Sequence, residues 1–344
     1  MFEHRLNQRF YKNDLSTKPL KWTLAIVLFL MLFFRGGIFF SATLENQGVI
    51  FYQQSLLHFG NNDLLHKAEN HFVRAQNINP LNQSTSRWIG FTLASLGLEN
   101  DAISVWRVAD KEIYEELIFI GNQKRNANRF EDAILWYDRA IHLDPNKGDP
   151  WYYKGLAYEK LSRYEESINS LLTGLNQPQL SKIGQSNFYF RLGWILNQKQ
   201  EEPDWAEILA WYENALDSNS FSDNWTLMQT HFARGEILSR LDRKDEAIQE
   251  FAFVVANDPT HYASRVQLGL LLWELNHNTE RAEQLFWEAV KINQESKWAY
   301  RGLATLYQGT NKPELAIQMY QVVVTLDPQD TFAVSQLHIL EESN

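Results

Sequence analysis

Three histidines, His58, His66 and His71, lie close together near the start of the chain and are its nearest approach to a metal site. Imidazole nitrogens are common ligands of zinc and other transition metals. Two ligands on one α-helix reach the same ion when they are three or four residues apart, because those positions share a face. His66 and His71 are five residues apart. We therefore expect no metal ion and no cofactor.

Other catalytic chemistry finds equally little support. The chain has no cysteine, which excludes disulfides, zinc–thiolate sites, iron–sulfur clusters and a thiol nucleophile. It lacks a phosphate-binding loop, a dinucleotide-binding glycine fingerprint and a His-Glu-x-x-His motif. Acidic pairs are typical of solvated helix or loop faces, and they occur at Glu115–Glu116, Glu165–Glu166 and Glu201–Glu202. The sequence predicts a protein that is not an enzyme.

The charges of the chain are unevenly distributed. Lysine and arginine number 32 against 42 acidic residues, a net charge of −10. This balance argues against a nucleic-acid partner, because phosphate binding needs a clustered cationic surface. Residues 1–40 nevertheless contain six basic and two acidic side chains, a net charge of +4, which leaves −14 for the remainder.

A long apolar stretch follows the basic residues. Trp22 to Phe34 contains no charge, and after Arg35 the apolar character resumes as far as Phe40. As a helix, the nineteen residues from Trp22 to Phe40 would be about 28 Å long, close to the roughly 30 Å of a bilayer's hydrocarbon core. Arg35 lies near one end, where its side chain can reach the headgroups. We predict one transmembrane helix at residues 20–40.

The membrane topology follows from the same charges. The basic excess before the span keeps the N-terminus cytoplasmic, which makes residues 1–19 a basic cytoplasmic tail and 41–48 a linker, with the repeat domain on the non-cytoplasmic side. A cleaved signal peptide is the alternative, since the segment has a basic region before an apolar one. Against it, Arg35 interrupts the apolar region and Phe40 occupies a position where cleavage needs a small residue.

Beyond the apolar stretch the chain repeats itself with a period of about 34 residues. Residues 149–175 contain a glycine among aromatic residues, then a small residue, then bulky residues at helical spacing, and residues 117–145 show the same order. This pattern resembles the tetratricopeptide repeat (TPR), a helix-turn-helix unit. The resemblance implies an all-α fold, an α-solenoid of about eight repeats over residues 49–330, with a capping helix at 331–344.

The repeat can be phased on its central glycine. A glycine where two helices cross lets their backbones approach, and a facing aromatic side chain fills the space beside it. Eight units result, beginning near Val49, Gln83, Tyr114, Gly148, Ser186, Met228, Tyr262 and Glu295. Seven of them have the glycine, at Gly90, Gly121, Gly155, Gly193, Gly235, Gly269 and Gly302, and the first has Leu56 instead. Longer turns are expected around 198–205, 274–280 and 307–314.

The resemblance also implies a binding surface. In this family the first helix of each repeat usually lines a groove that holds extended peptides. On the phase above, the predicted groove is aromatic with scattered arginines: Arg87, Trp88, Phe91, Arg125, Tyr152, Phe190, Arg191, Trp194, Phe232, Arg240 and Trp273. Neighbouring candidates are Phe119, Asn122, Leu156, Glu236, Tyr300 and Tyr307. The family's carboxylate clamp needs Lys and Asn in consecutive repeats, and this set does not supply them.

These observations predict a membrane-tethered TPR scaffold that binds a protein partner, as an extended peptide or a protein surface, for example in envelope assembly, secretion or polysaccharide export. One alternative is a module that binds a glycan or acidic polymer through the aromatic and arginine groove. Another is an enzyme or the regulatory subunit of one. Many of the aromatic residues are equally suited to the core between helices. The sequence does not fix the partner or the oligomeric state.

Overall fold

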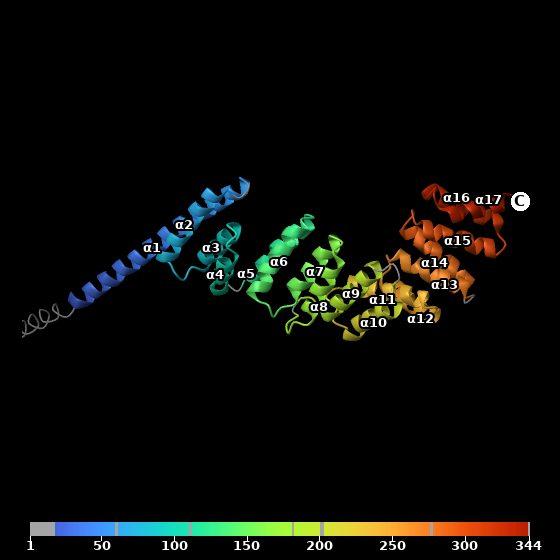
Figure 1. Cartoon of the computed structure of the whole chain (residues 1–344), viewed down its shortest axis with the longest axis horizontal. Helices are drawn as coiled ribbons and strands as arrows, with labels where there is room; N and C mark the ends of the chain where they lie inside the picture. Colours follow the sequence, from blue (N-terminus) through green and yellow to red (C-terminus); the bar gives the residue numbers. More distant parts are fainter. Residues whose placement is uncertain are drawn as a thin grey trace, which may run out of the picture. The chain divides into compact units, whose positions relative to one another are not determined.

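The computed structural model describes residues 18–58, 61–109, 112–180, 182–199, 203–275 and 278–342, without the side chains at 18–25, 28, 29 and 32. Within these ranges the chain forms seventeen α-helices and no β-sheet (Figure 1). The expected all-α class is confirmed. The predicted cytoplasmic tail at 1–19 lies almost wholly outside the described residues.

The chain divides into two compact units, residues 1–145 and 146–344. The helices of the first unit are α1 (Lys18–Leu57), α2 (Asn62–Ile78), α3 (Gln83–Ser95), α4 (Glu99–Val108), α5 (Ile113–Asn126) and α6 (Phe130–Leu143). Those of the second are α7 (Asp149–Lys160), α8 (Tyr164–Leu175), α9 (Gln185–Lys199), α10 (Trp205–Ser218), α11 (Asn224–Arg240), α12 (Lys244–Asn257), α13 (Tyr262–Glu274), α14 (Thr279–Ile292), α15 (Lys297–Gly309), α16 (Pro313–Leu326) and α17 (Thr331–Glu342). The helices pair into eight antiparallel hairpins, and α17 packs against the last.

Five of the hairpins are closed by the same type of turn. The turn contains a single residue with a positive φ angle, at Gly97, Asn128, Ser162, Asp242 and Asn311. The N–H of the following residue donates to the carbonyl five positions earlier, as in the 2.9 Å bond from Arg129 to Lys124. This Schellman-type closure satisfies carbonyls at the end of the first helix. The predicted longer turn at 307–314 is wrong, because α15 and α16 are joined by this same three-residue turn.

The predicted glycines lie where helices cross. A Cβ atom added at Gly121 would lie 2.5 Å from the Tyr137 ring, and one at Gly235 would lie 2.8 Å from Phe251. Gly90, Gly155, Gly193 and Gly269 likewise face a bulky side chain on the second helix of their own hairpin. Gly302 differs, since it faces Phe286 of the preceding hairpin. The crossings leave no room for a side chain, because the facing residue already fills the space.

The first repeat begins earlier than predicted. Residues 41–48 are not a linker but part of α1, which continues unbroken to Leu57. Ser41 and Leu44 are buried, and Ser41 donates a 3.0 Å hydrogen bond to the Ala75 carbonyl of α2. The crossing glycine is Gly48, where an added Cβ would lie 2.6 Å from Phe72, and Leu56 is exposed. The 34-residue phase missed it because both helices of this hairpin extend further from the crossing towards the turn.

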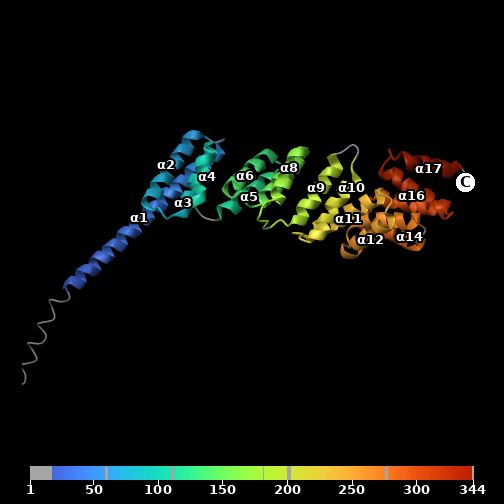
Figure 2. The ribbon, with the colours of Figure 1, turned by 60° about the horizontal axis from the view of Figure 1, so that its bottom comes forward.

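The first part of α1 differs from the rest of the helix in its surface. It runs past the end of α2 in both views (Figures 1 and 2). Its described side chains are mainly apolar and exposed: Ile26, Val27, Leu30, Met31, Phe33, Phe34, Ile38, Phe39 and Phe40. Among the described residues, no helix was found with the length and apolarity required to span a bilayer. The membrane span at 20–40 therefore stays a prediction.

The last helix, α17, closes the second unit. Ala333 is fully buried against α16, and Leu337 and Leu340 pack partly on the same core. The Asp330 carboxylate accepts a 3.0 Å hydrogen bond from the Ala333 N–H, which caps the start of the helix. The helix covers apolar surface that the last hairpin would otherwise expose, as terminal helices do in repeat proteins.

Candidate functional site

An open cleft lies across three successive first helices of the second unit, α11, α13 and α15. Its volume is about 480 Å³. It is lined by Phe232 and Glu236 of α11, by Tyr262, Ala263, Val266, Gln267 and Leu270 of α13, and by Trp298 of α15. Helices α13 and α15 pack directly on each other, so their side chains form one continuous surface.

Aromatic rings give the cleft its apolar surface. Tyr262 is 36% exposed and Trp298 is 53% exposed, both high for large aromatic side chains. Phe232 is more enclosed, since its ring centroid lies 5.7 Å from that of Phe251 and 4.9 Å from that of His261. Exposed Trp and Tyr in a hollow surface are the residues that most often dominate protein binding.

Glu236 is the carboxylate in the lining of the cleft. It is half-buried, and burial raises the pKa of its carboxyl above the ordinary value, with the Arg240 charge one turn away acting in the opposite direction. Within the described residues its carboxylate has no hydrogen-bond or ion-pair partner. The buried Glu250 on α12 contrasts with it, because Glu250 accepts from His231 at 2.6 Å and pairs with Arg234.

Three cations near the cleft have acidic partners. Lys297 and Arg301 flank Trp298 and pair with Asp327 at 2.5 Å and with Asp330 at 3.6 Å, respectively. The buried Arg265 of α13 lies 3.4 Å from Glu288 and also donates to two backbone carbonyls. These pairs neutralise three of the nearby positive charges, whereas Arg240 lies over the Trp205 ring and acts on Glu236 without a direct ion pair.

Several predicted groove residues are instead core residues. Phe91, Tyr152 and Phe190 are 5%, 5% and 1% exposed. Their rings pack against neighbouring aromatic residues, as in the 5.0 Å contact between Tyr152 and Phe188. Burial also raises the pKa of Tyr152. These side chains are not open to a ligand, so the aromatic groove predicted at their positions is wrong.

The predicted tryptophans also serve packing. Trp88 is partly buried and stacks on Phe72, with ring planes 7° apart and centroids separated by 6.2 Å. Trp194 lies 6.1 Å from Phe190 and is part of the core of the second unit. Trp273 fills the space above Gly309, where an added Cβ would lie 2.5 Å from its ring.

The predicted groove arginines do not line the cleft, and two of them lie beside glutamates of neighbouring helices. Arg87 of α3 pairs with Glu116 of α5 at 2.5 Å, and Arg191 of α9 lies 3.4 Å from Glu159 of α7. Arg125 is half-buried. Arg240 is exposed and lies over the Trp205 ring at 4.9 Å. An anion-binding surface made of free arginines is therefore not present at Arg87 and Arg191.

Phe232 is the predicted groove residue that lines the cleft, and Glu236, a neighbouring candidate, lies one turn further along the same helix. The repeat phasing did not predict that Tyr262 and Trp298 line the cleft. Both lie in the first turn of their helices, towards the N-terminus from the crossing glycines Gly269 and Gly302. Their position ahead of the packing pattern is the signal that could have identified them.

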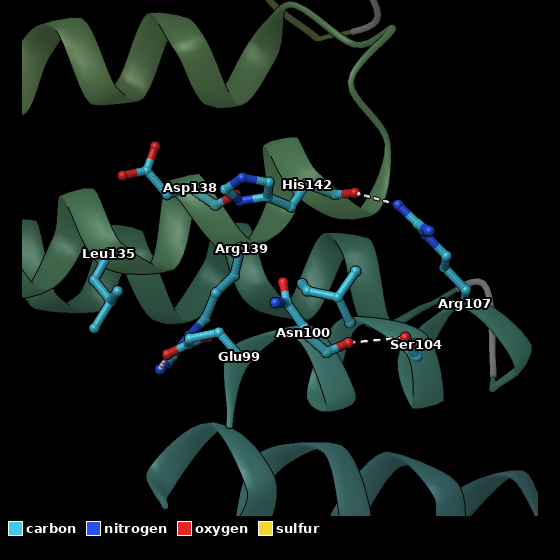
Figure 3. A pocket seen from close by; sticks show the side chains of 9 residues that line it. Glu99, Asn100, Ser104, Arg107, Leu135, Asp138, Arg139 and His142 are labelled. Carbon is cyan, nitrogen blue, oxygen red and sulfur yellow. Dashed lines mark hydrogen bonds and ion pairs between the residues drawn. The ribbon is translucent and has the colours of Figure 1, made fainter. Parts of the chain in front are cut away.

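A second hollow, of about 380 Å³, lies between α4 and α6 in the first unit. Figure 3 shows Glu99 and Arg139 converging within it. Arg139 donates to both carboxylate oxygens of Glu99, at 2.5 and 2.9 Å, and its guanidinium lies 4.3 Å from the Trp136 ring. Arg107 donates to the His142 carbonyl at 3.1 Å. These contacts connect successive second helices and give the hollow a structural role.

The three N-terminal histidines do not converge on a common point. His66 pairs with Glu69 at 3.3 Å, and the His71 ring lies against Phe51. In the described parts of the chain, no cluster of three or more His, Asp or Glu side chains is placed to hold a metal ion.

Comparison with known proteins shows which proteins this chain resembles. A family model described as TPR repeat matches residues 121–162, which cover α5 to α7. The human protein O-mannosyl-transferase TMTC3 is 21% identical over 206 residues, which are 57% of this chain and 22% of that protein. The chain thus spans less than a quarter of this relative.

Two solved structures show the same fold. The structure of Pseudomonas aeruginosa pilF aligns with 67% of this chain and 97% of its own, with a TM-score of 0.53 and 11% identity. The Cut9–Hcn1 hetero-tetramer of APC/C aligns with 82% of this chain and 56% of the matched chain, with a TM-score of 0.51 and 15% identity. Together with the matched repeat, this likeness shows that the chain has a TPR-like fold, an all-helical solenoid of hairpins.

Proposed function

We propose that this protein is a TPR scaffold that binds an extended segment of a protein partner in the cleft of α11, α13 and α15. The observation that carries the proposal is the exposure of Tyr262 and Trp298 on successive first helices that line one hollow. The described lining of the cleft offers aromatic and aliphatic surface with one carboxylate, which suits binding. We therefore assign binding, and not catalysis, to the chain.

The dimensions of the cleft suit an extended peptide. Packed helices lie about 10 Å apart, so three successive helices span about 20 Å. An extended chain rises roughly 3.3 Å per residue, so about six residues would cross the cleft. Their side chains would alternate between the cleft and the solvent, which lets the two exposed rings contact every second residue.

We further propose that the first part of α1 tethers the scaffold to a membrane, with the repeats on the non-cytoplasmic side. The proposal is supported by the exposed apolar side chains between Ile26 and Phe40, of which Phe33 is 70% and Phe39 is 76% exposed. The same helix continues into the first hairpin, so the tether would connect to the repeats without a linker. Envelope assembly, secretion and polysaccharide export are the settings that suit such a protein.

Site-specific photo-cross-linking tests the binding proposal. A benzophenone amino acid replaces Gln267, which lines the cleft, and, as the matched control, Gln249, which is exposed on α12. In cells, the label at position 267 should give a discrete adduct with a second protein, and the adduct should be lost on Trp298→Ala. Equal adducts at both positions, or an adduct that persists in the Trp298→Ala protein, would contradict the proposal.

A further inference from the structure

We propose that the cleft recognises a lysine or arginine side chain of the partner segment, with the Glu236 carboxylate as its counter-ion and the exposed Tyr262 ring as a further contact. The inference rests on the proposed peptide-binding function and adds the chemical class of the residue that is recognised.

The first observation is the state of Glu236. Removing a carboxylate from water is unfavourable unless hydrogen bonds or an opposite charge compensate for it. Burial raises the pKa of Glu236, and among the described residues no side chain or backbone N–H donates to it. Arg240 on the same helix influences that pKa, but its guanidinium lies over Trp205. The half-buried carboxylate thus has no direct hydrogen-bond or ion-pair partner among the described residues.

The second observation concerns the surrounding charges. Lys297, Arg301 and Arg265 are each paired with an acidic residue, so none of them leaves an unbalanced positive charge at the cleft. The protein as a whole has a net charge of −10. An approaching cation is therefore attracted at long range and finds, at short range, a carboxylate that has no direct ion-pair partner among the described residues.

The third observation is the aromatic surface. The face of an aromatic ring attracts a cation within about 6 Å of its centroid. Trp298 already has Lys297 at 5.0 Å and Arg301 at 5.4 Å, whereas no described cation lies over Tyr262. The charged head group of the partner's lysine or arginine would lie between Glu236 and Tyr262. The apolar stem of that side chain, or a neighbouring side chain of the partner, would contact Trp298.

The test uses fluorescent heptapeptide libraries with one fixed central residue and three random residues on each side. The fixed residue is lysine, arginine, norleucine, citrulline or glutamate. Norleucine keeps the four-carbon stem of lysine and citrulline keeps the shape of arginine, both without the charge. Binding to the full-length protein in mild detergent is followed by fluorescence anisotropy. The lysine and arginine libraries should bind at least about tenfold more tightly than their uncharged counterparts, because a charge-assisted hydrogen bond contributes at least this factor.

Two variants localise the effect. Glu236→Gln keeps the shape of the side chain and should abolish the preference for lysine and arginine. Asp245→Asn removes the same charge from an exposed position on α12 and should leave the preference unchanged. Thermal melts confirm that both variants are folded.

The outcomes separate the inference from the function on which it rests. Peptide binding without a preference for basic residues, or a preference that survives Glu236→Gln, would overturn the inference and leave the peptide-binding function standing. Failure of every library to bind the wild-type protein would overturn both. A preference for the glutamate library would show that the cleft takes an acidic ligand.

Discussion

The carboxylate of Glu236 lowers the stability of the fold that contains it. Its pKa is raised by burial, so the folded protein binds the proton more tightly than the unfolded chain does. Stability therefore falls as the pH rises from about 4.5, the ordinary value, through the raised folded pKa, and stays lower above it. A cation bound beside the carboxylate would offset this cost, because an opposite charge favours the ionised form.

This argument yields a prediction on pH and stability. Glu236→Gln should raise the melting temperature at pH 7, because glutamine has no charge to desolvate. The gain should shrink as the pH is lowered towards 4, where the wild-type carboxyl becomes protonated. Differential scanning fluorimetry across the pH range measures both effects.

The control for this prediction is the other partly enclosed acid of the same hairpin. Glu250 is paired with His231 and Arg234. Glu250→Gln should lower the free energy of unfolding at pH 7 by about 1–3 kcal/mol, because it leaves Arg234 with a weaker partner. A stabilising effect of Glu250→Gln, or a destabilising effect of Glu236→Gln at pH 7, would contradict the assigned electrostatics.

At the scale of the element, seven of the eight described hairpins contain a close crossing at a glycine. The Tyr137 ring occupies the space beside Gly121, and its hydroxyl donates a 2.9 Å hydrogen bond to Asn122. The ring is thus fixed at both ends and cannot move aside at low cost. The crossing glycine sets the distance between the helices, and the aromatic side chain fills the remaining gap.

Gly121→Ala tests this packing. The added methyl group should lower the free energy of unfolding by about 1–3 kcal/mol through overpacking. Gly36→Ala is the matched control, because Gly36 is also helical and has no atom within 4 Å of an added Cβ. That change should be neutral, or stabilising by up to about 1 kcal/mol, since alanine favours helix. Urea denaturation compares the two, and equal losses would show that the crossing is not the cause.

At the scale of the whole molecule, the predicted membrane tether determines where the repeats act. If residues 20–40 span a bilayer, the full-length protein should remain in the membrane fraction after alkaline carbonate extraction. The mature protein should also retain its N-terminus. An enzyme reporter that is active only outside the cytoplasm, fused after Asn344, should be active, because the basic excess precedes the span.

A control variant and two possible results test the membrane-tether prediction further. Replacing Leu30 and Phe34 by arginine should release the protein into the soluble fraction, since each charge in a span costs about 2.5–3.5 kcal/mol. A soluble mature protein that begins after residue 42 would establish the signal-peptide alternative. Activity of a cytoplasm-specific reporter would reverse the orientation.

The sequence by itself determined the repeated hairpins. Glycine spacing and the apolar pattern of each helix are local signals, and seven of the crossing glycines could be identified from them, with Gly302 packing against the preceding hairpin. The phase failed in the first repeat, where both helices are longer than the family pattern and Gly48 takes the crossing position. Local periodicity identifies the packed face of a helix but not the length of the hairpin.

The binding surface was decided by the tertiary structure. Neighbouring positions on a helix differ by about 100° in direction, so one face packs on the partner helix while the next faces the groove. The position of a residue in the repeat did not distinguish the buried Phe190 from Phe232, which lines the cleft. It also did not show that Tyr262 and Trp298 are exposed while other aromatic residues pack in the core. The ion pairs could not be predicted from the sequence either, because Arg87 pairs with Glu116 and Arg139 with Glu99, which are 29 and 40 residues apart in the chain. Such contacts depend on how hairpins stack, and that stacking determines which charges, including Glu236, are left for a partner.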